Sequence, residues 1–332
     1  DIAPGQTKEI EIPWLSVENQ EAVKIVSAIL KEDTLWEKAG YEVAYGQSVV
    51  GSYHNQIHHE DELKIVVGDG NIGVRCGKLK ALFANSEGLI SLKNDGIEYI
   101  ARAPRPVFWR ATTDNEKGYK HDVHSIAWYG ASIAFDCTKF EYQIGEDGKS
   151  VCILYRYELP VLPKTKVDVI YTVSAHQFIK VNMKYYGQEG LPEIPLIGMR
   201  FKLYKTTDYF KYYGLGPQEN YIDRKNGTKL DIYKQNILEN VTPYLKPQEC
   251  GNRCGVRYLD LIDDNQKGIR FEMLKQPFEA TVLPYSFEEL QQSLHQEELS
   301  PSYYTYVTIA SKQMGVGGDD SWGAPILPQY CI

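Results

Sequence analysis

Apolar and polar residues alternate along most of this chain in short runs, and turn-forming residues separate the runs. From residue 63 onward the runs include LKIVV, KALFA, SVCILYRYEL, KVDVIYTVS and YYTYVTIAS. Alternation with a period of two, interrupted at short intervals by Gly, Asn or Asp, is typical of an antiparallel meander. The pattern therefore predicts an all-β chain in which residues 63–332 form one large antiparallel sandwich.

The first part of the chain contains too few strands for a domain of its own. Residues 8–14 alternate, and the segments at 21–30 and 41–50 are apolar with several β-branched residues, so we expect three strands. A sandwich of the immunoglobulin type has about seven strands. Residues 1–53 are therefore interpreted as the C-terminal part of an immunoglobulin-like sandwich. Because the sequence begins with Asp1 and not Met, we expect it to come from a longer protein.

A polar segment, HNQIHHEDE at 54–62, separates the two parts and has no periodicity. Such a composition favours a linker. The adjacent His58 and His59 would point to opposite faces of a strand, so a solvated linker is favoured over a metal site. The predicted organisation is a partial sandwich at 1–53, a linker at 54–62 and a large sandwich at 63–332.

Two segments favour helix. FEELQQSLHQ at 287–296 follows Ser286, and Glu289 stands three residues after that serine, which is the capping box of a helix start. The segment HSIAWYGA, which contains Trp128, is a weaker helical patch. We therefore expect helices to be a minor addition to a chain of strands.

The composition narrows the range of partners. The 332 residues include 36 basic and 44 acidic side chains, for a net charge of −8. No basic stripe is present that could neutralise phosphates, so nucleic acid is not an expected partner. A membrane is not expected either, because no run of about 18 apolar residues could span a bilayer. The 25 tyrosines favour sheet surfaces, on which the ring packs while the hydroxyl reaches water.

Cysteine usage gives no sign of a disulfide scaffold or a metal site. Six cysteines are sparse for a chain of 332 residues. Cys250 and Cys254 stand close together, but no second pair of Cys or His follows at the spacing that a four-ligand zinc site needs. We expect ordinary thiols.

No targeting signal is visible in the sequence. The expected compartment is the cytoplasm, with export of the parent protein left open.

Three segments contain Gly, Asp, Asn or Trp where a strand would not need them. PVFWRATTDNEKG at 106–118 predicts a fixed, hydrogen-bonded turn with carboxylates beside Arg110. YGLGPQENYIDR at 213–224 predicts a rigid corner, after which Glu219 and Arg224 are able to form an ion pair. For both segments a structural role is favoured over an active site.

The third segment, MGVGGDDSW at 314–322, is the candidate for function. Its glycines let the backbone approach another surface, and Trp322 offers a flat apolar face on which sugar C–H groups stack. The structural alternative is a tryptophan that closes the end of the sandwich. Asp319 and Asp320 are neighbours, so they cannot flank a glycosidic bond as the two carboxylates of a glycosidase do. Other catalytic motifs are also absent from the sequence, and catalysis by this chain alone is not predicted.

Four motifs together resemble a known family: RATTDNEKG, YYGLGPQENYIDR, TPYLKPQECGNRCGVRYL and MGVGGDDSWGAP. They resemble the C-terminal β-sandwich of the large β-galactosidases of glycoside hydrolase family 2. WEKAGYEVAYGQ, within residues 1–50, resembles the end of the immunoglobulin-like domain that precedes it there. The resemblance covers essentially the whole chain in order. It implies a supersandwich of the galactose-mutarotase type over about 63–332. It also implies a role as the C-terminal part, or small subunit, of a retaining β-galactosidase that hydrolyses terminal β-D-galactosides such as lactose.

In that family the catalytic glutamates and the magnesium and sodium ions belong to an upstream TIM barrel, which this sequence does not contain. The resemblance thus implies no catalytic residue and no cofactor in this chain. It implies three partners: the barrel region, a galactoside and, because the full enzyme is expected to be an oligomer, further copies of that enzyme. Trp322 is expected beside the bound sugar, with Asp319 and Asp320 holding its loop. Residues 118–124 resemble a segment that moves near the pocket.

Arg110, Asp114 and Asn115 of the first motif are further candidates near the sugar. This motif departs from the family form R-A-P-x-D-N-D, with Thr112 in place of proline and Glu116 in place of aspartate. Two other functions stay open at this point. One is a carbohydrate-binding module with an affinity of its own. The other is a mutarotase-like epimerase, which rests on fold analogy and would need a histidine acid and a glutamate base in one pocket.

Overall fold

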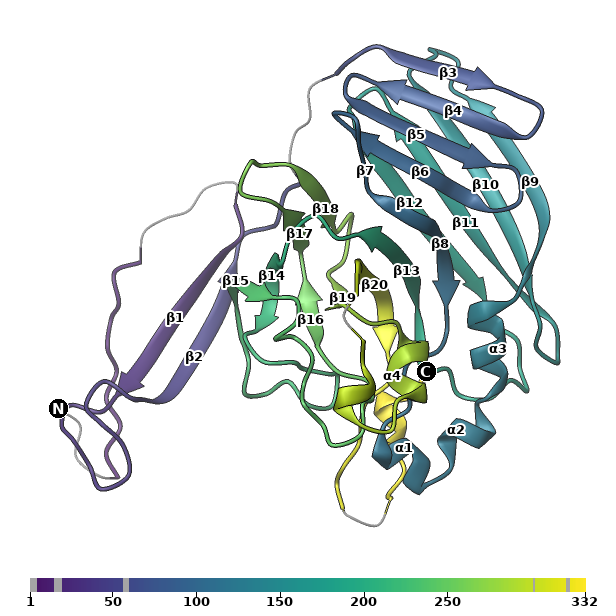
Figure 1. Cartoon of the computed structure of the whole chain (residues 1–332). Helices are drawn as coiled ribbons and strands as arrows, with labels where there is room; N and C mark the ends of the chain where they lie inside the picture. The colour runs from purple at the N-terminus through teal and green to yellow at the C-terminus, as the bar shows by residue number, and fades with distance from the viewer. Residues whose placement is uncertain (1–4, 15–19, 56–59, 301, 321–322) are drawn as a thin grey trace. The chain divides into compact units, whose positions relative to one another are not determined.

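The computed structural model of the chain describes residues 5–14, 20–55, 60–300, 302–320 and 323–332. The chain divides into two compact units, Asp1–Gln56 and Ile57–Ile332, and each is described here by itself. Figure 1 labels the helices and strands of both units.

The first unit contains one antiparallel pair of strands, β1 (Ala22–Ile29) and β2 (Glu42–Val50). These are two of the three strands expected from the sequence. Residues 8–14 are irregular, so the strand prediction there is wrong. Pro13 has no N–H to donate to a ladder, and no described strand pairs with this segment. Val26 of β1 is 49% exposed, and an isolated pair of strands is only marginally stable.

The described part of the second unit contains four antiparallel sheets, which confirms the all-β prediction. Two sheets come from the first half of the unit. The sheet of order β3-β4-β5-β6-β7 comprises β3 (Leu63–Val67), β4 (Asn71–Cys76), β5 (Leu79–Ala84), β6 (Gly88–Asn94) and β7 (Ile97–Glu98). The sheet of order β12-β11-β10-β9 comprises β9 (Asp136–Ile144), β10 (Ser150–Leu159), β11 (Thr165–Ser174) and β12 (Ile179–Tyr186).

The other two sheets take most of their strands from the second half of the unit. The sheet of order β16-β19-β20-β13-β8 comprises β8 (Ile100–Val107), β13 (Leu196–Tyr204), β16 (Asn252–Val256), β19 (Phe278–Leu283) and β20 (Tyr304–Gln313). The sheet of order β15-β14-β17-β18 comprises β14 (Tyr209–Gly216), β15 (Lys229–Asn236), β17 (Tyr258–Ile262) and β18 (Gly268–Glu272).

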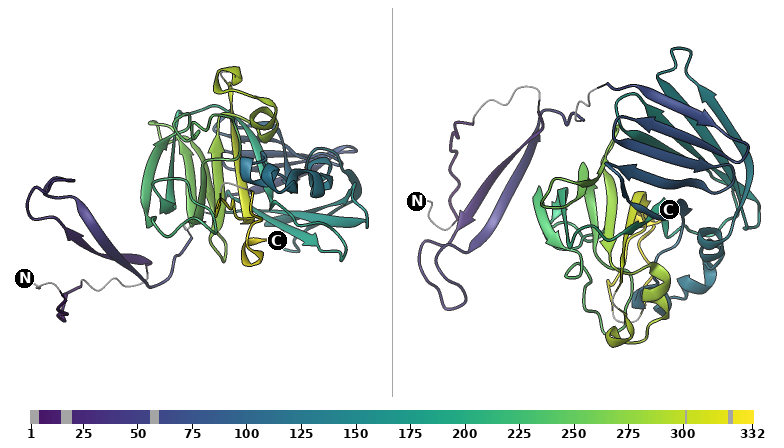
Figure 2. Two further views of the ribbon diagram at one scale, coloured as in Figure 1. Left: turned by 90° about the horizontal axis from the view of Figure 1, so that it is seen from below. Right: turned by 45° about the horizontal axis from the view of Figure 1, so that its top comes forward.

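The sheets pack face to face in pairs. Figures 1 and 2 show the β3–β7 sheet lying across the β9–β12 sheet. The rings of Phe83 and Tyr171 lie 5.3 Å apart between them, and the Tyr155 hydroxyl donates to the Ala84 carbonyl at 2.8 Å. Along β10, half-buried and buried residues alternate without a break, as period-two patterning requires.

The second pair of sheets is joined in the same way. Phe201 of β13 and Phe271 of β18 have ring centroids 4.9 Å apart. Arg253 of β16 donates from Nε to the Tyr212 hydroxyl of β14 at 2.9 Å. One continuous cluster of buried apolar residues includes members of both pairs. The second unit therefore has a single core, and the ends of its strands carry the segments singled out from the sequence.

The helices are short. α4 (Phe287–Gln292) begins at the predicted capping box: the Ser286 hydroxyl accepts from the Glu289 N–H, and the Glu289 carboxylate accepts from the Ser286 N–H. The patch around Trp128 forms α2 (His121–His124) and α3 (Ala127–Ile133). Two 3₁₀ turns, η1 (Gln296–Glu298) and η2 (Pro328–Tyr330), are also present.

Two of the three irregular segments contain regular structure that the sequence pattern did not reveal. The predicted turn at 106–118 ends in a helix, α1 (Asp114–Gly118). The predicted corner at 213–224 overlaps the last four residues of β14 (Tyr209–Gly216), so Gly214 and Gly216 belong to a strand. The corner itself follows at Pro217, and the predicted ion pair between Glu219 and Arg224 is confirmed at 2.8 Å.

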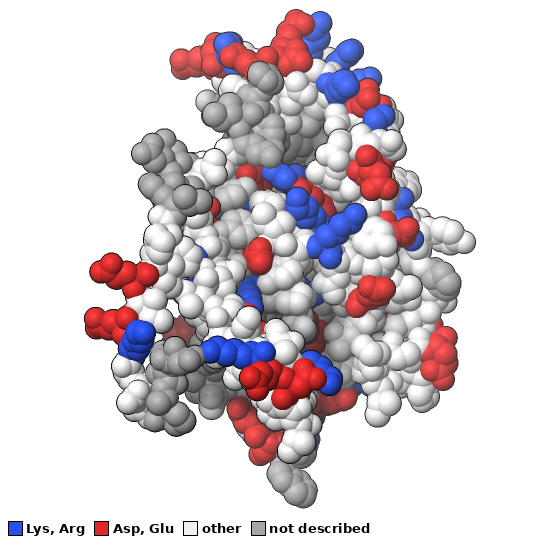
Figure 3. All heavy atoms as spheres, turned by 90° about the vertical axis from the view of Figure 1, so that its left-hand side faces the viewer, with Lys and Arg blue, Asp and Glu red and all other residues white. Residues whose placement is uncertain are grey.

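Charged side chains, and side chains of the types that bind metal ions, are dispersed over the described part of the protein. On the face drawn in Figure 3, acidic and basic side chains are interspersed over a mostly uncharged surface. Cys250 and Cys254 are buried free thiols, as expected. Among the described residues, which exclude His58 and His59, no group of three or more His, Cys, Asp and Glu side chains is placed to hold a metal ion. Within the same residues, no helix has both the length and the apolar character needed to cross a bilayer.

The contact between the first two sheets predicts the effect of a core truncation. Phe83 is fully buried, and replacing a buried phenylalanine by alanine costs about 3–5 kcal/mol because it leaves a cavity. Phe83→Ala should lower the free energy of unfolding by that amount in urea denaturation followed by near-ultraviolet circular dichroism. Val66→Ala on β3, where Val66 is 69% exposed, should change it by less than about 0.5 kcal/mol. Equal effects of the two substitutions would contradict the face-to-face packing.

Candidate functional site

Residues 314–318, called here the 314–318 segment, continue the chain after β20 and are attached to the region that follows β8. The attachment depends on Arg110, three residues beyond the end of β8. Its Nη1 donates to the Met314 carbonyl at 2.6 Å and its Nη2 to the Gly315 carbonyl at 2.5 Å. The guanidinium therefore holds two successive carbonyls of a segment that is 204 residues away in sequence.

The charge of Arg110 is balanced by Glu116. The two side chains form a buried ion pair with Nη2 and Oε1 2.7 Å apart, and each is about 1–2% exposed. Burial alone would lower the pKa of Arg110, but the carboxylates of Glu116 and Glu249 outweigh that effect and raise the pKa above its ordinary value. Arg110 is thus a permanent cation inside the protein.

Glu116 also fixes the start of α1. Its Oε2 accepts from the Thr113 N–H at 2.8 Å, and the Thr113 hydroxyl accepts from the Glu116 N–H at 3.1 Å. This is a capping box, in which the two residues satisfy each other's free N–H groups. The same carboxylate therefore caps the helix and neutralises Arg110. The sequence signal for this helix start was present in T-x-x-E, whereas the pairing of Glu116 with Arg110 is seen only in the structure.

Two further side chains hold the 314–318 segment. Asn115 of α1 donates from Nδ2 to the Val316 carbonyl at 3.0 Å. Asp223, from the corner after β14, accepts the N–H groups of Val316 and Gly317 at 2.9 and 2.8 Å. The segment is thus fastened through both its carbonyl and its N–H groups, from two different parts of the chain. Asp223 was not among the residues predicted from the sequence.

Backbone contact completes the attachment. Gly118 at the end of α1 and Gly323 lie so close that a Cβ on Gly118 would stand 2.8 Å from the Gly323 Cα. Gly323 has φ of +81°, a conformation that favours glycine. No side chain fits between the two backbones. Glycine at both positions is therefore required for this approach of α1 to the chain beyond the 314–318 segment.

The structure brings only some of the predicted site residues together. Arg110 and Asn115 both contact the 314–318 segment, whereas Asp114 faces Gln248, whose Nε2 donates to Asp114 Oδ2 at 3.0 Å. Asp319 and Asp320 are exposed, and Asp320 Oδ1 accepts from the Ala324 N–H at 3.1 Å. Trp322 lies outside the described residues, so its role stays a prediction.

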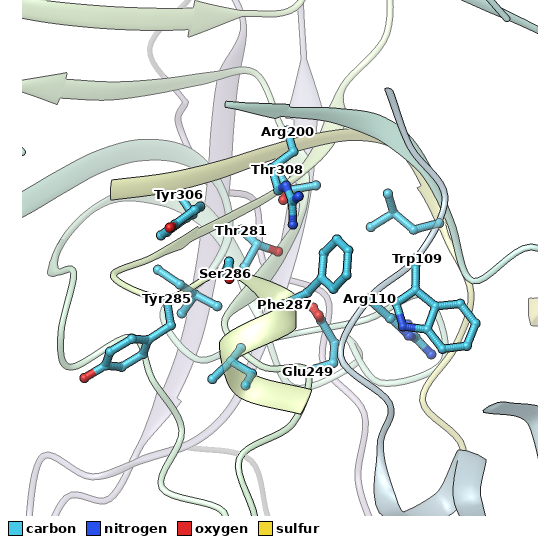
Figure 4. A pocket seen from close by; sticks show the side chains of 13 residues that line it. Trp109, Arg110, Arg200, Glu249, Thr281, Tyr285, Ser286, Phe287, Tyr306 and Thr308 are labelled. Atoms are coloured by element: carbon cyan, nitrogen blue, oxygen red, sulfur yellow. The ribbon is translucent and has the colours of Figure 1, made fainter. Parts of the chain in front are cut away.

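Glu249 stands beside this network and faces the inside of the molecule. With Arg110 it lines a cavity of about 30 Å³ next to α4 (Figure 4), enough for about two water molecules and far too small for a sugar. Burial raises the pKa of Glu249 to about 7. The positive charge of Arg110 lowers this pKa, whereas the negative charges of Glu116 and Glu219 raise it further. The Tyr221 hydroxyl donates to Glu249 Oε1 at 3.3 Å. The network thus joins one cation to two carboxylates, of which Glu116 makes the direct pair.

The corner after β14 is fixed by Glu219. Besides Arg224, its carboxylate accepts from the Thr242 hydroxyl and from the Gly251 N–H, each at 2.7 Å. These bonds join the corner to the segment that leads to β16. Because Asp223 belongs to the same corner, Glu219 indirectly positions one of the groups that hold the 314–318 segment.

Comparison with known proteins matches this chain to two successive family models. Residues 1–51 match the model for domain 4 of β-galactosidase, and residues 75–332 match the model for the β-galactosidase small chain. The second match covers well over half of the sequence and includes every residue of the network described above. The chain belongs to the β-galactosidase small-chain family.

Curated relatives agree with this membership. A β-galactosidase of Halalkalibacterium halodurans is 38% identical over 340 aligned positions, which cover 100% of this chain and 33% of the relative. A β-galactosidase of Streptococcus thermophilus is 34% identical over 100% of this chain and 32% of its own length. A β-galactosidase small subunit of Latilactobacillus sakei is 33% identical over 81% of this chain and 93% of its own length. This small-chain family member thus spans about a third of the length of the first two relatives, and its alignment covers nearly all of the small subunit.

The raised pKa of Glu249 predicts how stability depends on pH. An ordinary glutamate has a pKa of 4.5, and that of Glu249 in the folded chain is about 7. Between about pH 4.5 and 7 the folded state therefore holds a proton that the unfolded state has lost, so stability falls as the pH rises through this window and levels off above it. Glu249→Gln cannot ionise, and it should be more stable than the parent at pH 8 by up to about 3 kcal/mol and nearly equal at pH 4.5.

Urea denaturation at both pH values measures this difference. Glu297→Gln, at an exposed position, removes the same charge from the surface and should leave the pH dependence of the parent unchanged. If Glu249→Gln keeps the full loss of stability between pH 4.5 and 8, Glu249 does not carry the proton.

Proposed function

We propose that this chain is the C-terminal part, or small subunit, of a retaining β-galactosidase that hydrolyses terminal β-D-galactosides such as lactose. The observation that carries the proposal is the succession of two β-galactosidase family models along one chain, the second of which extends to residue 332. The catalytic glutamates, with the magnesium and sodium ions, are assigned to a barrel region outside this sequence. The chain itself supplies non-catalytic structure, and the barrel region is its partner.

The proposal also accounts for the incomplete first unit. In the segment between β1 and β2, Leu35 is fully exposed and Trp36 is 61% exposed. Large apolar side chains exposed next to each other mark a surface that binds another part of a protein. We propose that the preceding part of the enzyme covers them and completes an immunoglobulin-like sandwich. For the second unit we propose the supersandwich class, which is supported by two pairs of facing sheets around one core.

The sugar contact is proposed at the chain beyond the 314–318 segment. Arg110, Asn115 and Asp223 hold this segment by five hydrogen bonds, and such rigid support is what a binding loop needs to present a side chain at a fixed position. We propose that Trp322 forms a wall of the galactoside pocket and that Asp319 and Asp320 support its loop. Arg110 and Asn115 are then positioning residues that do not touch the sugar.

Separating the chain from the rest of the enzyme tests the proposed role. The purified chain should not hydrolyse a chromogenic β-galactoside, because it has no pair of catalytic carboxylates of its own. The remaining part of the enzyme, tested alone, should be weakly active or inactive, and mixing the two should restore turnover. Turnover by the pure chain, or full activity of the remainder without it, would contradict the proposal.

Truncating Trp322 tests the proposed wall. In the complete enzyme Trp322→Ala should raise KM about fivefold, since a lost aromatic contact is worth about 1 kcal/mol. Steady-state kinetics on a chromogenic galactoside and on lactose measure the change. Tyr303→Ala, which truncates an aromatic that is 84% exposed, is the matched control and should leave KM unchanged. An unaltered KM in Trp322→Ala would remove this residue from the pocket.

A further inference from the structure

A second pocket lies on the outer face of β8 and β13, and none of the residues that hold the 314–318 segment line it. Its volume is about 200 Å³, many times the 10–15 Å³ or so that a single water needs. Four basic side chains and one carboxylate line it: Arg102, Arg105, Arg200, Lys202 and Glu288. In a chain with a net charge of −8, such a surplus of positive charge in one hollow is unusual.

The basic side chains stand opposite one another on neighbouring strands. In the antiparallel register of β8 and β13, Arg105 pairs with Arg200, and Arg102 pairs with Lys202. Like charges directly opposite each other destabilise a sheet. Arg105 is half-buried, and its pKa is lowered by that burial and then by Arg102 and Arg200, while Glu87 and Tyr157 act in the opposite direction. The pocket thus holds cations that repel one another.

The charges within the pocket are only partly compensated. Arg200 makes a two-pronged ion pair with Glu288, with distances of 2.6 and 2.8 Å. The Lys202 ammonium lies 3.9 Å from the ring centre of Tyr304. Among the described residues, neither Arg102 nor Arg105 forms an ion pair. The two arginines of β8 are therefore available to an anion from outside.

Neutral donors border the same space. Tyr306 lines the pocket together with Ser286, and both also border the small cavity in Figure 4. Burial raises the pKa of Tyr306 to about 12, so its hydroxyl keeps its proton and is able to donate. Arginine forks and a hydroxyl donor are the groups that bind phosphate oxygens in proteins.

We propose that this pocket binds a phosphate group, either as the free ion or as the terminal group of a phosphorylated metabolite, held by Arg102, Arg105 and Lys202. A doubly charged tetrahedral anion offers oxygens to several donors at once, which a single carboxylate cannot do to the same extent. The proposal is independent of the galactosidase role, because it uses none of the residues of the 314–318 network.

Titration of the full 332-residue chain with inorganic phosphate tests the site. Isothermal titration calorimetry at constant ionic strength should give saturable binding of one phosphate per chain. Glucose 6-phosphate and glucose serve as the second and third titrants. Tighter binding of the ester than of free phosphate assigns the site to a phosphorylated metabolite, and the reverse order assigns it to the free ion. Glucose alone should give no signal, and an equal signal from glucose would overturn the proposal.

Substitutions locate the bound anion. Arg102→Gln and Arg105→Gln should each weaken phosphate binding about tenfold or more, since each removes a charge-assisted contact. Arg75→Gln, at an exposed position of β4, removes the same charge elsewhere and should bind as the parent does. Because Arg105 is half-buried, circular dichroism checks that its variant is folded; Arg102 is exposed and gives the same test without that risk.

Glu288→Gln should change the affinity for phosphate in the opposite direction. It removes the carboxylate that occupies Arg200, so phosphate should bind severalfold more tightly. Absence of saturable phosphate binding to the parent, or equal weakening by Arg102→Gln and Arg75→Gln, would overturn the proposal.

Discussion

A single buried cation, Arg110, determines how the end of the chain is positioned. Its guanidinium is buried away from water, so it needs both a counter-charge and acceptors for its N–H groups. Glu116 supplies the charge, and the carbonyls of Met314 and Gly315 supply the acceptors. Removing one partner of such a pair typically costs about 3–5 kcal/mol, because the other charge stays buried without compensation. The position of the 314–318 segment is therefore as firmly fixed as the ion pair itself.

The same constraint explains why the pKa of Glu249 is raised to about 7. One guanidinium is able to neutralise one carboxylate in a dry environment, and Glu116 holds that place through its direct contact and through the capping box of α1. Glu249 is buried nearby without a cation of its own, so ionising it would add a second negative charge. The arrangement of lowest free energy keeps a proton on Glu249, and the Tyr221 hydroxyl donates a hydrogen bond to the same carboxyl group.

Local patterns in the sequence predicted local features well. Alternation predicted the strands whose two faces differ in polarity, such as β10, and the capping box predicted the start of α4. β8 was missed because its sequence, IARAPRPV, contains two prolines, which are unfavourable in most strands. β8 accommodates them because it is the edge strand of its sheet and pairs with β13 alone. The first motif was interpreted as a turn because its polar residues favour side-chain bonds to the backbone, although its T-x-x-E spacing marks α1.

The site depends on contacts that no local pattern encodes. Asp223 reaches Gly317 across 94 residues, and that contact exists only because β14 and β20 belong to sheets that pack on one another. Residue types in the motifs indicated a hydrogen-bonded region, but they did not indicate which oxygen accepts from which N–H. The family resemblance supplied the proposed function, which physical reasoning from the residues left open.

The arrangement of β8 and β13 shows how the fold can impose an unfavourable surface. Met199 and Phe201 face the core and set the register of β13. With a side-chain period of two, that register necessarily turns Arg200 and Lys202 to the opposite face, where β8 presents Arg105 and Arg102 in the paired positions. A one-residue shift would relieve the repulsion but would move the apolar residues out of the core, at a cost of about 1.5–3 kcal/mol for each. The core therefore holds the cations together, and binding an anion is the compensation that leaves the register unchanged.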